Sequence, residues 1–184
     1  MLFLYCTLTF LILIAVLPII IVAVTSIIII DNQNPLYLEK RSGLFGKPFT
    51  IIKLRTMKFN HNKTITKLGG FLRFSKIDEL TQIFNVVMGQ MSLVGPRPLY
   101  PEYNAKYTNF EMKRLNVKPG ITGLAQIKVT DTNNWRHKFK YDVFYADKKT
   151  VAFDFYILRK TFFFYLNILL GKKIIKENHD RFGD

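Results

Sequence analysis

Hydrophobic and polar positions are sharply separated along this chain. Residues 1–30 contain no charged side chain, and Asp31 is the first charged residue. Only this stretch reaches the roughly 18–20 apolar residues that a membrane span needs. After Asp31, apolar residues recur in short clusters with strand or helix spacing, without repeats or low-complexity linkers. We therefore predict a membrane-inserted segment over residues 1–30 and one folded domain over residues 31–184.

The apolar segment has too few signals for a secretory leader. No Lys or Arg precedes its core, and Ile27–Ile30 offers no small residue for cleavage. A straight helix of this length would run about 45 Å, well beyond a hydrocarbon core of about 30 Å. Pro18 lies near its middle, lacks a backbone N–H and clashes with the carbonyl of Ile14. A kinked full span and a helix that breaks at Pro18 and re-enters both fit.

The folded domain is predicted to be α/β, mixed and helix-rich with a few short strands. Turn residues such as Gly and Pro separate the elements. Ser75 and Asp78 have the form of a capping box, which predicts a helix start there. The last predicted helix is rich in aromatics, and it is either a core helix or an interfacial amphipathic helix lying among lipid headgroups. The predicted elements are strands over Leu36–Lys40, Phe49–Arg55 and Met91–Val94, a turn and strand over Ile121–Val129, and helices over Lys67–Phe74, Asp78–Met88, Glu102–Leu115, Trp135–Lys148 and Phe153–Leu170.

Composition narrows the class of protein. The chain has 27 Lys and Arg against 13 Asp and Glu, a net charge of +14, and 49% hydrophobic residues. So apolar a chain is not disordered, and a single cysteine, Cys6, excludes a disulfide-stapled domain. The basic body predicts a cytoplasmic location by the positive-inside rule, and attraction to anionic membrane lipid. Nothing but charge favours nucleic acid, so no nucleic-acid partner is expected.

Adjacent carboxylates at Asp78 and Glu79 are conspicuous among so many bases. In the first turn of a helix, the dipole would keep Asp78 ionised, and an ionised aspartate can attack phosphorus. Glu79 could hold Mg²⁺, which usually takes one or two protein carboxylates and completes its shell with water and phosphate. The alternative is that both residues only cap a helix. The bases that could neutralise phosphate oxygens are Lys53, Arg55, Arg73, Arg97 and Lys118.

The Gly95-Pro-Arg-Pro98 segment is the other distinctive local pattern. Two prolines restrict the backbone on either side of Arg97. A stiff loop of this kind would present one planar guanidinium, which suits a bidentate grip on phosphate. The alternative is a rigid turn with a solvated arginine.

Together these segments resemble the bacterial sugar transferase family, specifically the small monotopic polyprenyl-phosphate phosphoglycosyl transferases. The resemblance covers almost the whole chain. Any one segment is weak, but their order and spacing make a specific pattern. After the apolar segment with its central proline come six motifs: GKPFTIIKLRTM (46–57), SKIDEL (75–80), QIFNV (82–86), MSLVGPRP (91–98), KPGITG (118–123) and YDVFY (141–145).

The resemblance implies a reaction in which a nucleotide sugar, usually a UDP-sugar, donates its phosphosugar to polyprenyl (undecaprenyl) phosphate. It implies that Asp78 is the nucleophile and that Glu79 binds the Mg²⁺ cofactor. Arg97 and Lys118 are implied on the substrate side, and Arg55 and Asp142 match further family positions. The implied location is the bacterial inner membrane with the catalytic domain on its cytoplasmic face, and possible partners are later glycosyltransferases of a glycan pathway.

The resemblance also favours re-entry at Pro18 over a full span, because the family's membrane helix is broken at a proline. Two departures stand out. Leu17 replaces the serine that commonly precedes this proline, and Lys118 replaces the usual arginine. The runner-up interpretation is a non-catalytic, basic, membrane-anchored module of the same fold that binds lipid or a partner.

Overall fold

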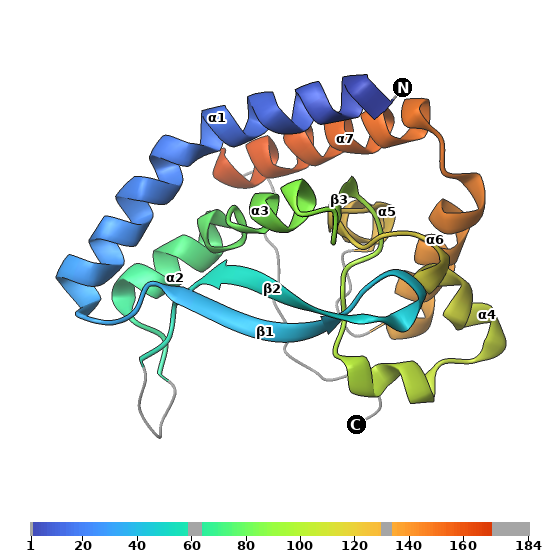
Figure 1. Ribbon diagram of the computed structural model, residues 1–184, viewed down its shortest axis with the longest axis horizontal. Coiled ribbons are helices and arrows are strands. Elements are labelled where there is room, and N and C mark those ends of the chain that lie inside the picture. Colours follow the sequence, from blue (N-terminus) through green and yellow to red (C-terminus); the bar gives the residue numbers. More distant parts are fainter. Residues whose placement is uncertain (1, 59–63, 130–133, 171–184) are drawn as a thin grey trace. The chain divides into compact units, whose positions relative to one another are not determined.

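A computed structural model describes residues 2–58, 64–129 and 134–170 (Figure 1). The described chain divides into two compact units, one formed by residues 1–39 and 50–89, the other by residues 40–49 and 90–184. The predicted mixed, helix-rich fold with few short strands is confirmed. The helices are α1 (Leu2–Ser26), α2 (Lys67–Phe74), α3 (Gln82–Val87), α4 (Asn109–Met112), α5 (Leu124–Lys128), α6 (Trp135–Lys148) and α7 (Val151–Leu169), and the strands are β1 (Leu36–Ser42), β2 (Pro48–Leu54), β3 (Ser92–Val94) and β4 (Gly120–Thr122).

Helix α1 contains Pro18 in its interior and continues through it to Ser26, where a π-helical turn, Ile27–Asp31, follows. Proline removes one backbone hydrogen bond and crowds the preceding turn, which kinks or breaks a helix. Figure 1 shows this bend along α1. The helical structure is therefore not interrupted at Pro18, and the path of α1 through a membrane stays a prediction.

The apolar length of α1 also stands out. Among the described residues, one helix, Thr7–Asp31, is long and apolar enough to cross a membrane, and only 17% of its most apolar window is buried. Large apolar side chains such as Leu11 and Val22 are more than 60% exposed. Near the chain reversal, however, Ala23 and Ile27 pack into a core with Leu54 and Leu72. The C-terminal half of α1 thus belongs to the first unit and is not a detached anchor.

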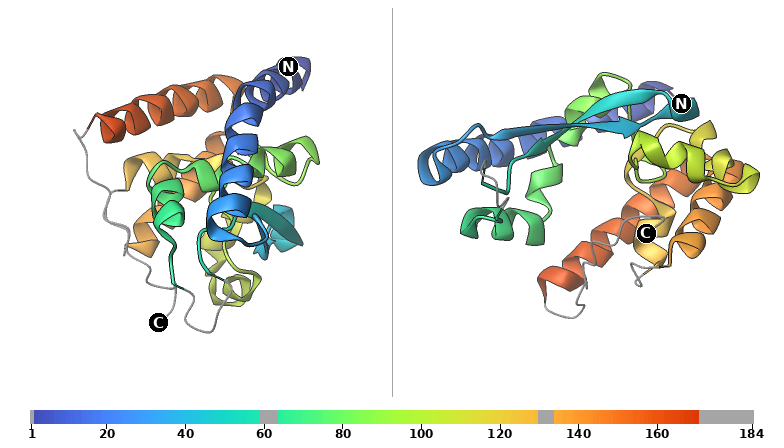
Figure 2. Two further views of the ribbon diagram at one scale, coloured as in Figure 1. Left: turned by 90° about the vertical axis from the view of Figure 1, so that its left-hand side faces the viewer. Right: turned by 90° about the horizontal axis from the view of Figure 1, so that it is seen from below.

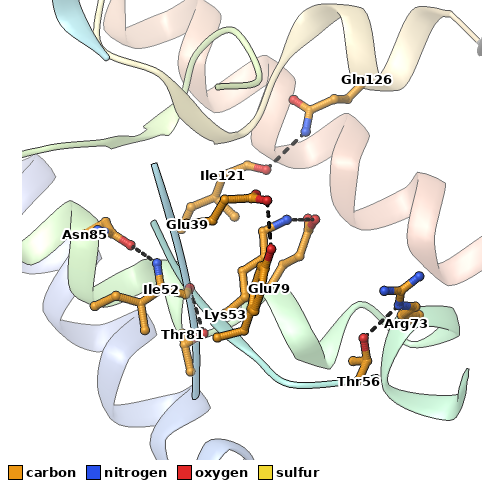
Figure 3. Close-up of polar contacts among 11 residues, drawn as sticks. Glu39, Ile52, Lys53, Thr56, Arg73, Glu79, Thr81, Asn85, Ile121 and Gln126 are labelled. Carbon is orange, nitrogen blue, oxygen red and sulfur yellow. Dashed lines mark hydrogen bonds and ion pairs between the residues drawn. The ribbon is translucent and has the colours of Figure 1, made fainter. Parts of the chain in front are cut away.

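In the first unit, α3 is fastened to β2 by buried side chains. Asn85, fully buried, donates to the Thr50 carbonyl at 2.8 Å and accepts from the Ile52 amide at 3.0 Å. The Thr81 hydroxyl donates to the Ile52 carbonyl at 2.9 Å (Figure 3). An amide side chain that replaces a missing strand partner satisfies both backbone groups of β2 at once. These contacts set where the residues just before α3 can lie.

The second unit is built around a short parallel pair, β3 and β4, in the register Ser92–Gly120 and Val94–Thr122. The two strands approach so closely that a Cβ on Gly120 would collide with the backbone nitrogen of Gly95, so glycine is required there. Helix α6 packs against α5, and α7 is one long helix (Figure 2) that contacts β3, β4 and α5. This pair supports the Gly95–Pro98 loop.

Several predicted elements are confirmed: both long strands, the strand before Gly95, and the helices over residues 67–74, 135–148 and 153–170, with shifts of a few residues at their ends. Three predictions are wrong, and one of them is the helix over Asp78–Met88, which is reduced to α3, Gln82–Val87. Residues 102–115 form two 3₁₀ segments and α4, because Tyr107 is extended and Thr108 with Glu111 makes a true capping box. Residues 124–128 form helix α5 in place of the predicted strand, with Gly123 as its extended N-cap residue.

Candidate active site

Asp78 and Glu79 do not start a helix as predicted. Ser75 is the C-cap residue of α2. Its hydroxyl donates to the Phe71 carbonyl, one turn earlier, at 2.8 Å, so the expected capping box is absent. Lys76 then adopts a left-handed conformation (φ 59°), which is unusual for a side chain with a Cβ. The two carboxylates follow in a 3₁₀ turn, Ile77–Glu79, and α3 begins only at Gln82. The pair therefore lies in a short 3₁₀ turn between α2 and α3.

Asp78 is left with unmet hydrogen-bonding capacity. Its Oδ1 atom is buried and has no hydrogen-bond partner among the residues that the structure describes. Burial, and after it the negative charge of Glu79, raise the pKa of Asp78 from 3.8 to about 6, against the opposing charges of Lys53, Lys76 and Arg73. The predicted reason for its ionisation, a helix dipole, is wrong, because Asp78 lies in a 3₁₀ turn and not in the first turn of a helix. With a pKa near 6, roughly nine-tenths is still ionised at pH 7.

Glu79 is held differently from its neighbour. Lys53, on β2, donates to Glu79 Oε1 at 3.2 Å, and both side chains are largely buried (Figure 3). Asn85 and Thr81 fix β2 against α3, and this places Lys53 of β2 beside Glu79. The same ammonium lowers the pKa of Asp78. Lys53 thus connects the strand to both carboxylates, one by contact and one through its charge.

The other predicted bases of the first unit have structural partners. Arg55 donates to the backbone carbonyls of Asn34 at 2.8 Å and Leu36 at 3.0 Å, which ties the end of β2 to the start of β1. Arg73 donates from Nε to the Thr56 hydroxyl at 2.8 Å (Figure 3). Arg73 also contributes to the potential at Asp78, because its charge lowers the pKa of that carboxyl.

Asp78 and Glu79 are too few ligands for a magnesium site made of protein groups alone. They suit a site in which water and substrate phosphates supply the other ligands. No group of three or more His, Cys, Asp or Glu side chains converges among the described residues. Two adjacent carboxylates, one with an unpartnered buried oxygen, are hard oxygen donors of the type that Mg²⁺ takes together with substrate phosphates. The residues present are therefore compatible with Mg²⁺, with Glu79 as the protein donor.

In the second unit, Arg97 is exposed between two buried prolines, Pro96 and Pro98. This matches the predicted presentation of one guanidinium from a stiff loop. Lys118, at the entry to β4, is also exposed. The carbonyl of Pro96 accepts from the Gly120 amide at 3.0 Å, so the two segments that carry these cations are directly connected.

Asp142 has an internal partner. It lies on α6, is 4% exposed, and its Oδ2 accepts from Nε and Nη2 of Arg114 at 3.1 and 2.9 Å. Burial raises its pKa, and the Arg114 charge opposes that effect. The carboxylate thus faces the core of the unit, which gives no support to the predicted direct contact with substrate.

Arg114 itself was missed, because Lys113-Arg114 in a charged helix-like segment looks like solvated surface. The structure instead buries it to 2% exposure. Tyr145, the last residue of the YDVFY motif, is also fully buried, and its hydroxyl lies 2.6 Å from Asp154 and 3.0 Å from the Val94 carbonyl. The charged residue Asp142 inside an otherwise apolar motif was the only sign that a buried basic partner exists. A pairing across 28 residues leaves no local pattern, so the sequence did not identify Arg114 as that partner.

The first unit offers a partly desolvated carboxylate beside a second carboxylate and a lysine. The second unit, by itself, offers an exposed arginine on a rigid loop. Such groups suit chemistry on a phosphate. A family model described as "Bacterial sugar transferase" matches residues 3–167. The chain belongs to the bacterial sugar transferase family.

Curated relatives agree with this assignment. The chain is 40% identical over 156 residues to the "Uncharacterized sugar transferase EpsL" of Bacillus subtilis (strain 168), covering 79% of this chain and 76% of that protein. It is 37% identical over 172 residues to the "UDP-glucose:undecaprenyl-phosphate glucose-1-phosphate transferase" of Klebsiella pneumoniae, covering 83% of this chain but 37% of that enzyme. A "Putative undecaprenyl-phosphate N-acetylgalactosaminyl 1-phosphate transferase" of B. subtilis (strain 168) is 41% identical over 101 residues, 48% of this chain and 56% of that protein.

Proposed function

We propose that this protein is a phosphoglycosyl transferase that moves a sugar 1-phosphate from a nucleotide sugar, a UDP-sugar, to undecaprenyl phosphate. The observation that carries the proposal is Asp78, a largely buried carboxylate with an unpartnered oxygen and a pKa near 6, beside Glu79 and Lys53. Family membership and the names of the relatives support the substrate class. A desolvated, mostly ionised carboxylate is a stronger nucleophile than a solvated one.

The reaction follows from this nucleophile in two displacements. A carboxylate oxygen of Asp78 attacks the phosphorus that bears the sugar, the bond from that phosphorus to the bridging oxygen breaks, and UMP leaves. A phosphate oxygen of the lipid acceptor then attacks the same phosphorus and frees the carboxylate, which yields undecaprenyl-diphosphate sugar. Lys53, which contacts Glu79, neutralises phosphate charge in these steps. Arg97 is proposed by its own exposure and chemistry as a phosphate-binding group. Mg²⁺ held by Glu79 would supply further neutralisation of the diphosphate.

The acceptor's lipid tail gives α1 its role. Exposed apolar residues along α1 and the exposed aromatics Phe162 and Phe163 of α7 are costly in water and suit a lipid surface. We therefore place the protein at the bacterial inner membrane, facing the cytoplasm, with α1 re-entering at the bend near Pro18 and α7 at the interface. Later glycosyltransferases that extend the product are the expected partners.

The deciding experiment uses the full chain in detergent with a panel of UDP-sugars, Mg²⁺ and undecaprenyl phosphate. UMP release, its loss in Asp78→Asn, and a phosphosugar adduct on Asp78 in the intact mass are expected. No turnover on any sugar, or full activity in Asp78→Asn, would replace this proposal with the non-catalytic lipid-binding module. Removal of residues 1–30 should abolish transfer to the long-chain acceptor in membranes, and full activity without them would refute the role of α1.

A further inference from the structure

The backbone of the Val94–Arg97 turn is held at almost every available carbonyl. The Val94 carbonyl lies 3.0 Å from the Tyr145 hydroxyl, and the Gly95 amide donates to the Thr122 carbonyl at 2.9 Å. The Pro96 carbonyl accepts from the Gly120 amide at 3.0 Å, and the Arg97 carbonyl accepts from Arg114 Nη2 at 2.8 Å. Prolines at 96 and 98 have no amide to satisfy. Two of these four contacts come from side chains, and both lead to α6.

Arg114 connects α6 to the end of the turn. Its Nε and Nη2 donate to Asp142, Nη1 donates to the Tyr107 hydroxyl at 3.1 Å, and Nη2 also reaches the Arg97 carbonyl. The guanidinium lies 5.3 Å from the Phe139 ring centroid and 5.6 Å from that of Tyr107. A planar fork can make these contacts together, whereas a lysine ammonium cannot. Asp142 supplies the charge that makes a buried guanidinium tolerable.

Helix α6 presents the supporting groups on one face. Phe139, Asp142 and Tyr145 follow at intervals of three residues, and each is no more than 4% exposed. Asp142 acts on the Arg97 end of the turn through Arg114, and Tyr145 acts on the Val94 end. The Tyr145 hydroxyl is oriented by Asp154 of α7 at 2.6 Å. One helical face therefore fixes both ends of the turn that displays Arg97.

We infer that this face of α6 is a positioning platform for Arg97, with Arg114 and Tyr145 as positioning residues that act on substrate only through the backbone of the Val94–Arg97 turn. This inference rests on the proposed function for its catalytic readout, since Arg97 is there a phosphate-binding group. It predicts a specific coupling: disturbing the platform matters only as long as the Arg97 side chain is present.

The test is a double-mutant cycle in the full chain with UDP-sugar and undecaprenyl phosphate. Arg114→Lys keeps a charge beside Asp142 but loses the fork, and Tyr145→Phe removes one hydroxyl. Each should lower kcat/KM for the nucleotide sugar about tenfold in the native background and less than about twofold in Arg97→Ala, because neighbouring sites that act as one unit are not additive. Tyr141→Phe, a half-buried tyrosine of the same helix whose ring lies against His137, is the matched control.

A second measurement does not depend on turnover. Amide hydrogen exchange over residues 94–99 should quicken in Arg114→Lys and Tyr145→Phe but not in Tyr141→Phe. If the native protein releases no UMP, the proposed function fails while the exchange data still decide the platform. Equal losses in both backgrounds of the cycle, or unchanged exchange in both platform variants, would overturn the inference.

Discussion

The turn that carries Asp78 and the loop that carries Arg97 are both tight and both bear a charged residue, yet they treat polar groups in opposite ways. Asp78 is partly buried with an unpartnered oxygen, its pKa is raised, and the residue two positions earlier is in a left-handed conformation. Around Arg97 the backbone is hydrogen-bonded at both ends, and the supporting charge of Arg114 is paired with Asp142.

The difference is consistent with the two proposed roles, a nucleophile at Asp78 and a phosphate-binding group at Arg97. An unsatisfied buried carboxylate costs stability, and such groups persist where reactivity requires them. A residue that only grips charge can stay exposed, provided its backbone is rigid, because rigidity lowers the entropy lost on binding. The same chemical change, aspartate to asparagine, should therefore have opposite consequences in the two regions.

The largest effect is expected from Asp78→Asn on turnover. The amide keeps the size of the side chain but is not nucleophilic, so kcat should fall by about 10³-fold or more. UMP release in a continuous assay measures this, with intact mass reporting the missing adduct. Residual activity within tenfold of the native protein would mean that another group attacks phosphorus.

Stability should change in the opposite sense at the two aspartates. Asp78 has a folded pKa of about 6 against 3.8 when unfolded, so native protein binds the extra proton and its stability falls as pH rises from about 3.8 to about 6. At pH 7, Asp78→Asn should relieve this cost and raise the free energy of unfolding, by about 1–2 kcal/mol. Asp142→Asn leaves the buried Arg114 without its opposite charge and should lower the free energy of unfolding, by about 3–5 kcal/mol.

Denaturant unfolding at pH 7 compares the two variants directly. Destabilisation by Asp78→Asn would show that its carboxylate is better satisfied than the structure describes. Equal stability of Asp142→Asn and the native protein would show that the Arg114 pair contributes nothing to the fold, which would remove the basis of the contrast.

The two regions also differ in how far the sequence predicts them. Asp78, Glu79 and the exposed Arg97 between prolines were identifiable because local pattern and chemistry coincide there. The turn geometry could not be predicted, because the Ser75 hydroxyl donates to the Phe71 and Leu72 carbonyls of α2, whereas in a capping box it would accept from an amide three residues later. Residues 102–115 read as one helix because their apolar spacing is helical, while Thr108 and Glu111 restart the helix inside it.

Long-range pairs are the contacts that the sequence does not predict. Asp142 and Arg114 are 28 residues apart, and Asn85 replaces a strand partner for β2 across 33 residues. Neither pairing leaves a local periodicity, and only the family resemblance places Asp142 on the substrate side. Arg114 follows a lysine in a charged segment, which is typical of surface, yet it is only 2% exposed.

A smaller effect is expected at the satisfied region when only the exposed group is removed. Arg97→Ala leaves every backbone contact of the loop in place, so the free energy of unfolding should change by less than about 0.5 kcal/mol. kcat/KM for the nucleotide sugar should fall about 10- to 100-fold through loss of a charge-assisted phosphate contact. Lys47→Ala, an exposed base in the same unit, serves as control. An equal loss in both variants would assign the effect to general charge.

The smallest expected effect concerns how activity depends on pH through the turn that carries Asp78. Because Asp78 must be ionised to attack, kcat/KM should fall on the acid side with an apparent pKa near 6. Lys53 lowers the pKa of Asp78 by its charge, so Lys53→Gln should move this limb to higher pH by a fraction of a unit to about one unit. Lys67→Gln, exposed in the first turn of α2, should leave the limb unmoved. A limb that stays in place in Lys53→Gln would show that the titrating group is not Asp78, because no other change in this variant compensates for the lost ammonium.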